Sequence, residues 1–91
     1  MDLKTEVIRN HQVIVKKINR EFIVLDANKG NLYKLNPTAE FIWKYTREKR
    51  AIEEIIEAVT NTFSVDLKKA EKEVNQFITR YIDSLFFIIN K

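Results

Sequence analysis

Few residues in this chain have side chains and spacing suited to catalysis or metal binding. His11 is the only histidine, which excludes paired-histidine zinc sites and leaves one isolated candidate base at the start of an expected strand. Ser64 and Ser84 lie near expected helix ends with no histidine nearby in the sequence, so we interpret them as capping or turn residues. Glu53 and Glu57 lie one helical turn apart, but no polar residue converges on them, which favours a solvated helix face. The sequence therefore predicts no catalytic site, no metal site and no bound cofactor.

Composition narrows the function classes further. The 91 residues include no cysteine, so disulfides and thiolate metal sites are impossible and a reducing cytoplasm is the expected location. A single glycine excludes the glycine-rich loops that bind dinucleotides and phosphates. The longest apolar run, Leu85–Ile89, is too short to span a bilayer, and the amino terminus has no signal-peptide pattern. We expect one cytoplasmic domain over residues 1–91 that is neither exported nor inserted in a membrane.

Positive charge is concentrated in the first half of the chain. Residues 1–50 carry 11 Lys or Arg against 6 Asp or Glu, whereas residues 51–91 carry 5 against 7. Four cations lie close together near the end of an expected helix: Lys44, Arg47, Lys49 and Arg50. This cluster could bind phosphates or an acidic peptide. It could equally stabilise the helix carboxyl terminus through the helix dipole, and the sequence leaves both interpretations open.

Three short segments near the amino terminus have the composition of strands. His11–Ile18, Arg20–Asp26 and Asn31–Leu35 are rich in β-branched and aromatic residues and too short for buried helices. Gly30 can adopt the positive φ that a tight hairpin between the second and third segments needs. These features predict an antiparallel three-stranded meander.

Three amphipathic helices are expected after the strands. Asn36 and Pro37 are typical of a helix start, and the first helix should end near Tyr45. The second should cover Ala51–Phe63, with isoleucines on one face and glutamates on the other. The third should begin at an Asp66 cap and continue into the run SLFFIIN near the carboxyl terminus. Its apolar stripe consists of Leu67, Ala70, Val74, Phe77, Ile78, Tyr81 and Leu85.

This order of elements predicts an α+β fold, a winged helix-turn-helix in which a three-stranded antiparallel sheet is followed by three helices. Trp43, beside apolar neighbours on the first helix, is interpreted as a core residue. Alternation in the second strand directs Phe22 and Val24 to one face of the sheet and Ile23 and Leu25 to the other. Helices can cover only one face of so small a sheet, so the other face should stay partly apolar. Such exposed area usually marks an interface, which predicts a homodimer or an enzyme complex through the sheet.

Nearly the whole chain, from Val13 to Ile89, resembles the PqqD-like family, the small peptide-binding domains called RiPP recognition elements. The stretches that match are IVLDANKGNLYKLNPTAEFIWKY, AIEEIIEAVTNTFSVD and AEKEVNQFITRYIDSLFFI. The most specific feature is a strand that ends in Leu-Asn-Pro-Thr-Ala, with a tryptophan four residues later and two helices beyond it. Two positions depart from the family pattern. Arg50 and Ala51 stand where a Gly-x-Thr helix cap is usual, and Ser84-Leu85 replaces a usual Gly-Leu.

The resemblance implies a non-catalytic binding module for the leader segment of a ribosomally made precursor peptide. Such a module presents the peptide to a modifying enzyme of the radical-SAM type or to a lasso-type protease and cyclase. The leader is expected to add as a strand beside the third strand and to pack against the third helix, which agrees with an unpaired strand edge in this sequence. The expected peptide-binding residues are Asn31, Leu32, Tyr33, Lys34, Lys69, Glu73, Phe77 and Arg80. The opposite flank of the helix offers Glu71, Asn75 and Ile82, and the sequence does not decide between the flanks.

Two other functions are compatible with the sequence. A winged-helix regulator that binds DNA would fit the fold and the basic pI of about 9.2. However, the third helix interleaves its lysines with Glu71 and Glu73, which would repel phosphates, so we expect no nucleic-acid partner. A purely structural subunit would form a tight complex with its enzyme and bind no leader peptide.

Overall fold

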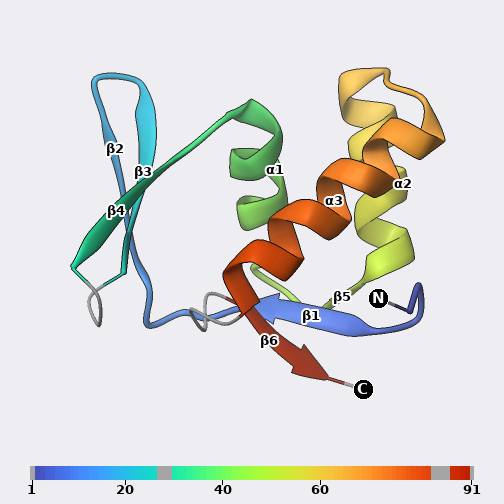
Figure 1. Ribbon diagram of the computed structural model, residues 1–91, viewed down its shortest axis with the longest axis horizontal. Helices are drawn as coiled ribbons and strands as arrows, with labels where there is room; N and C mark the ends of the chain where they lie inside the picture. The colour runs from blue at the N-terminus through green and yellow to red at the C-terminus, as the bar shows by residue number, and fades with distance from the viewer. Residues whose placement is uncertain (1, 27–29, 83–86, 91) are drawn as a thin grey trace.

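The computed structural model describes residues 2–26, 30–82 and 87–90. Figure 1 shows a three-stranded sheet on one side of the molecule, with helix α1 (Pro37–Tyr45) next to it. Helices α2 (Ile52–Phe63) and α3 (Leu67–Ile82) form the other side, and the carboxyl-terminal end of α3 reaches towards the sheet. A second small sheet lies beneath the helices. The predicted α+β class is therefore confirmed.

The three-stranded sheet is the predicted meander, with β2 (Ile14–Ile18), β3 (Glu21–Asp26) and β4 (Asn31–Leu35) in that order. Both residues between β2 and β3 have positive φ, 51° at Asn19 and 69° at Arg20, which is the pattern of a type I′ hairpin turn. Gly30 has a φ of 71° before β4, as predicted from its lack of a side chain. The expected strand start at His11 is wrong, because His11 lies in an exposed turn before β2.

The second sheet was not predicted. It places β1 (Glu6–Arg9) between β5 (Arg50–Ala51) and β6 (Phe87–Asn90), all antiparallel. The sequence predicts a third helix whose apolar stripe reaches Leu85, at the start of the run SLFFIIN, and Leu85 lies outside the described residues. The later residues of that run, Phe87–Asn90, form β6. Pairing such as Val7 with Ile89 joins opposite ends of the chain, and no local pattern reports it.

The helix starts follow the predicted capping chemistry. Asn36 Oδ1 accepts a hydrogen bond from the Ala39 amide at 2.8 Å, with Pro37 at the first helical position. Asp66 Oδ1 accepts one from the Lys69 amide at 2.8 Å. Helix α2 starts after Ala51, which has no side-chain acceptor for a cap. No helix in the described part of the chain is long and apolar enough to span a membrane.

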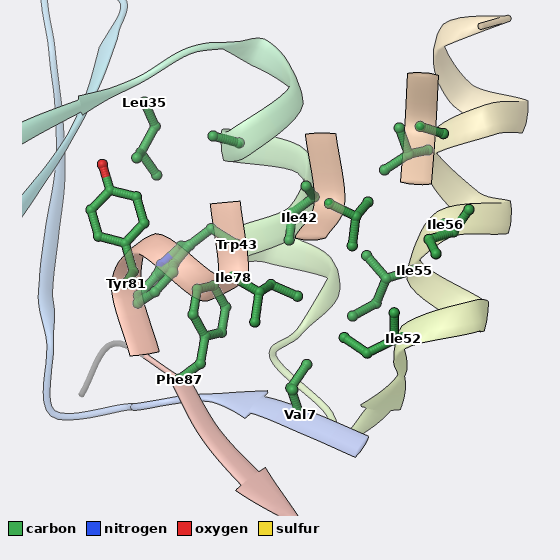
Figure 2. Packing of buried hydrophobic residues seen from close by; sticks show 14 of the residues in the cluster. Val7, Leu35, Ile42, Trp43, Ile52, Ile55, Ile56, Ile78, Tyr81 and Phe87 are labelled. Atoms are coloured by element: carbon green, nitrogen blue, oxygen red, sulfur yellow. The ribbon is translucent and has the colours of Figure 1, made fainter. Parts of the chain in front are cut away.

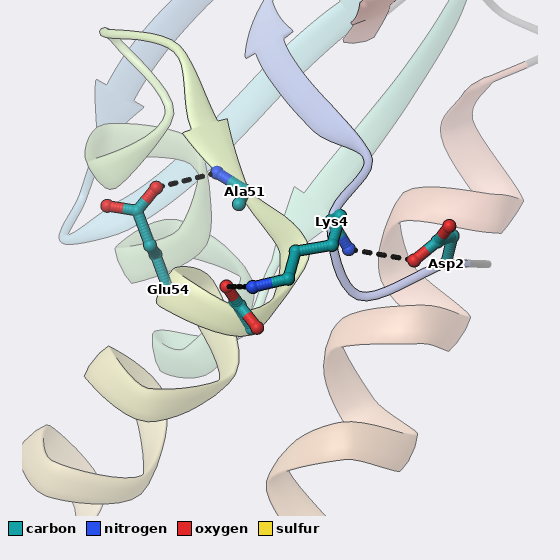
Figure 3. A network of polar contacts seen from close by, with 5 residues as sticks. Asp2, Lys4, Ala51 and Glu54 are labelled. Atoms are coloured by element: carbon teal, nitrogen blue, oxygen red, sulfur yellow. Dashed lines mark hydrogen bonds and ion pairs between the residues drawn. The ribbon is translucent and has the colours of Figure 1, made fainter. Parts of the chain in front are cut away.

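Half of a capping box remains at the start of α2. Figure 3 shows the Glu54 carboxylate, which accepts a hydrogen bond from the Ala51 amide at 2.9 Å. The amino-terminal segment supports the same helix end, since the amides of Ile52 and Glu53 donate to the carbonyls of Thr5 and Leu3. Carbonyl groups of residues 3–5 thus accept hydrogen bonds from amides in the first turn of α2, which have no partner within the helix.

One cluster of buried side chains connects both sheets with all three helices (Figure 2). Trp43 is 2% exposed, and its ring meets the Phe87 ring of β6 edge to face at 5.5 Å. The interpretation of Trp43 as a core residue is confirmed. The fully buried members include Val7 of β1, Val24 of β3, and residues from each helix: Ile42, Ile52, Ile55, Val59, Ala70, Val74 and Ile78.

The outer face of the three-stranded sheet, on the side away from the helices, is partly apolar, with Lys16 and Lys34 in the row next to the apolar one. Its register aligns Ile14, Leu25 and Leu32 in one row across the three strands. Leu32 is 68% exposed, Ile18 53% and Ile14 48%. The predicted two-faced sheet is therefore present, with Val24 and Leu35 buried on the inner face.

Replacement of Trp43 by alanine should destabilise the protein strongly. Loss of a buried indole leaves a cavity that costs about 3–5 kcal/mol, a large part of the stability of a domain this small. Urea denaturation followed by circular dichroism measures the change, and Trp43→Phe, which keeps a ring next to Phe87, should cost clearly less. An unchanged melting temperature in Trp43→Ala would contradict the core assignment.

The outer face should act as an interface with a second copy or with a partner protein, because contiguous exposed apolar area is rare on free surfaces. Light scattering across a concentration series, together with a pull-down of candidate partners, tests this expectation. Leu32→Ser should reduce any association while leaving the fold intact. A strict monomer that captures no partner would count against it.

Candidate functional site

A groove lies between strand β4, the start of α1 and helix α3. We call it the β4–α3 groove. Its lining residues come from β4 and its junction with α1, from α1 itself, and from one flank of α3: Lys34, Leu35, Asn36, Thr38, Ala39, Ile42, Glu73, Gln76, Phe77, Arg80 and Tyr81. The groove therefore combines a strand edge with a helix flank.

The strand register determines which peptide groups of β4 point outward from the sheet. The two-residue turn makes Ile18 and Glu21 a hydrogen-bonded pair, so alternate residues of β3 bond to β2 and the others bond to β4. Val24 and Phe22 thus bond to Tyr33 and Leu35. The N–H and C=O groups of Leu32 and Lys34 point to the opposite edge. No other strand within the described ranges pairs with that edge.

The charges around the groove are mixed. Lys34 forms an exposed ion pair with Glu21 at 2.7 Å, and the Arg80 guanidinium lies 5.5 Å from the centre of the Tyr81 ring. Glu73 lies on the same flank of α3 and is the one carboxylate among the lining residues. The helix flank of the groove therefore carries one cation and one carboxylate, Arg80 and Glu73, while the Lys34 charge is paired with Glu21.

Aromatic rings form the apolar part of the site. Tyr81 contacts the ring of Tyr33 at 5.3 Å and that of Phe77 at 5.1 Å, both edge to face. Phe77 also contacts Phe87 at 5.5 Å, which ties the groove to the core. Burial raises the pKa of the Tyr81 hydroxyl.

The structure brings together half of the residues predicted from the sequence. Lys34, Glu73, Phe77 and Arg80 line the groove, so this flank of α3, rather than the flank with Glu71, faces β4. Lys69 is exposed and does not line the groove.

The remaining predicted residues belong to β4 without lining the groove. Leu32 points to the outer face and offers only its backbone to the edge. The Tyr33 ring packs against the ring of the lining residue Tyr81, and Asn31 is the first residue of β4. The lining residues that sequence reasoning missed are mainly those of the strand-to-helix junction and α3: Asn36, Thr38, Gln76 and Tyr81. The sequence predicts Asn36 as a helix cap, and no sequence pattern around it indicates that it also lines a groove.

Other candidate residues have structural partners. Glu53 forms an ion pair with Lys4 at 2.8 Å. In the cation cluster, Lys44 pairs with Glu40 at 2.8 Å, and Arg50 stacks on Tyr45 at 4.3 Å from the ring centre. Across the described parts of the chain, no three His, Asp or Glu side chains lie close enough together to hold a metal ion.

Comparison with known proteins identifies the family of this fold. The model of the family described as coenzyme PQQ synthesis protein D (PqqD) matches residues 21–84. A search of curated proteins gives no match.

Two solved structures share the fold. TbiB1 in complex with the TbiA(beta) leader peptide is 22% identical, with a TM-score of 0.73 over 88% of this chain and 93% of that chain. Lasso peptide synthetase B1 complexed with the leader peptide is 17% identical, with a TM-score of 0.75 over 90% of this chain and 96% of that chain. Because the PqqD family model covers the sheet edge, all three helices and the groove between them, this chain belongs to the PqqD family.

Proposed function

We propose that this protein binds the leader segment of a ribosomally made precursor peptide in the β4–α3 groove and presents that peptide to a modifying enzyme. The observation that carries the proposal is the open edge of β4, whose Leu32 and Lys34 peptide groups face outward beside a groove with apolar and charged side chains. An extended peptide can pair with these groups as an added strand while its side chains contact α3.

In this proposal, β4 and α3 contribute to leader binding in different ways. Backbone pairing with β4 depends little on the sequence of the bound peptide, so it contributes affinity. Phe77 and Tyr81 offer an apolar contact, and Arg80 offers positive charge to an acidic side chain. Selectivity for one leader peptide would come from this helix wall.

The protein is proposed to act without catalysis, as the recognition part of a system whose chemistry resides in a separate enzyme. Both structural relatives were solved with leader peptides, and one of them is named as a lasso peptide synthetase component. A radical-SAM enzyme or a lasso-type protease and cyclase is the kind of partner that fits, and genes beside that of this protein would identify it.

A proline in place of Leu32 should weaken leader binding while the fold survives. It removes an outward N–H that the proposed added strand would use, and edge strands tolerate proline where the N–H faces solvent. Tyr33→Pro is the matched variant, because the Tyr33 N–H points to β3 and its loss should damage the fold itself. Fluorescence anisotropy with a labelled leader peptide, and thermal denaturation, separate the two effects.

Leu32→Ala is the control for the side chain, since it keeps the N–H and should bind almost as well as the wild type. If Leu32→Pro folds and binds the leader with unchanged affinity, strand addition to β4 is wrong. Amide shifts in the wild-type protein on leader addition should likewise follow residues 31–34 and the groove flank of α3. Shifts confined to α2 would move the site elsewhere.

Reversal of charge at Arg80 should change how leader binding depends on salt. If the leader is acidic, Arg80→Glu should slow association and reduce the salt dependence, because charges at the rim act mainly on encounter. Lys69→Glu on the same helix is a matched control, since Lys69 lies outside the groove. If both changes alter the salt dependence of leader binding equally, the net charge of the protein and not the position of Arg80 determines it, and the prediction is wrong.

Truncation of Phe77 should reduce leader affinity by about 1–3 kcal/mol through loss of an apolar anchor. Phe77 also packs on Phe87, so the stability of Phe77→Ala must be measured beside its affinity. Isothermal titration calorimetry at a temperature where the variant is fully folded measures the change in binding free energy without a contribution from unfolding. Full affinity under those conditions would remove Phe77 from the site.

A further inference from the structure

A second groove lies on the other side of α3, between α3, α2 and the amino-terminal segment. We call it the α2–α3 groove. Its lining residues are Leu3, Glu53, Ile56, Glu57, Thr60, Leu67 and Glu71. None of them lines the β4–α3 groove, so the two surfaces are separate.

Two of the three apolar residues that line this groove are exposed. Leu67 is 61% exposed and Leu3 46%, while Ile56 beneath them is buried. Leu3 lies at the start of α2, where its carbonyl accepts a hydrogen bond from the Glu53 amide at 3.0 Å. Leu67 begins α3, shortly after α2 ends, so it lies at the opposite end of the groove. Two exposed leucines thus flank a buried isoleucine.

The groove is lined by three glutamates, and those of α2 lie one helical turn apart. Glu53, Glu57 and Thr60 follow one another at i, i+4 and i+7 along α2, and Leu67 and Glu71 form a matching row on α3. The row on α2 spans roughly 10 Å, the length of two helical turns. Helix α2 carries three glutamates and no Lys or Arg, although the whole chain has a net charge of +3.

A lysine already occupies part of this acidic rim. Figure 3 shows Lys4, which is held through its amide by Asp2 at 2.9 Å. The Lys4 ammonium reaches Glu53 at 2.8 Å, and this hydrogen bond raises the pKa of Lys4. Glu57 and Glu71 have no ion pair among the described residues. Lys68 and Lys72 are exposed on α3 and line neither groove.

From this pattern we propose that the α2–α3 groove docks a short helix of a partner protein, with leucine-like side chains on its buried face and Lys or Arg along its flanks. Helices that enter grooves use apolar anchors on one face, and the exposed Leu3 and Leu67, with Ile56 beneath them, offer an apolar floor for such anchors. Basic flanks complement Glu57 and Glu71 and add to the role that Lys4 has at Glu53. This inference goes beyond leader binding and does not depend on it.

A synthetic helical peptide of about 14 residues tests the proposal, with leucines on one face and lysines on both flanks. Titrated into isotope-labelled protein, it should shift the amides of the α2–α3 groove. The same peptide with glutamates in place of the lysines should bind at least about tenfold more weakly, because its flanks meet like charges. Equal affinity of the two peptides, or shifts concentrated on β4 or on the outer face of the sheet, would overturn the proposal.

Protein variants give a second, independent readout. Glu57→Lys combined with Glu71→Lys should weaken the lysine peptide about tenfold, whereas Glu48→Lys, an exposed change away from the groove, should alter affinity less than about twofold. Leu67→Ser should lose affinity, whereas Ile18→Ser, at a side chain on the sheet that is also more than half exposed, should not. Unchanged binding in the double variant overturns the proposal. Concentration-dependent dimerisation that Leu67→Ser abolishes would overturn it too, since the occupant would then be a second copy of this chain.

Discussion

The junction between β4 and α1 is the constraint on which the binding surface depends. Pro37 has no N–H to donate and fixes φ for a helix start, while Asn36 Oδ1 satisfies the Ala39 amide at 2.8 Å. The strand must therefore end at Leu35, whose side chain is buried in the core. The position of β4 is thereby fixed relative to α1, and the groove forms where the two meet.

A small sheet covered on one face has two ways left to bind other chains. The inner face of β2, β3 and β4 is taken by the core, which leaves the outer face and the open edges of β2 and β4, and the β4 edge borders the β4–α3 groove. A peptide added at that edge would extend the outer face, since Leu32 and Lys34 point their side chains to it. Leader binding and contacts on the outer face would then share residues, while the α2–α3 groove lies apart from both.

Sequence patterns predicted the parts of the site whose signals are local. The capping residues Asn36 and Asp66, the hairpin glycine and the apolar stripe of α3 each depend on neighbours a few residues away. The flank of α3 that carries Glu73, Phe77 and Arg80 was proposed with its alternative, but only packing could decide between them. Lys69, predicted as a peptide-binding residue with these three residues, does not line the groove, because it lies one helical turn before Glu73 at the end of that flank.

The sequence by itself determined the meander, the three helices with their starts, and the burial of Trp43, because hydrophobic period, caps and turn residues act over short distances. Only the tertiary structure decided the second sheet, since β1 pairs with β5 from 43 to 45 residues away and with β6 from 78 to 84 residues away, and its four residues carry no distinctive pattern. The tertiary structure also decided the β4–α3 groove. Its walls come from β4, α1 and α3, and a surface built from distant segments exists only once the core has packed them together.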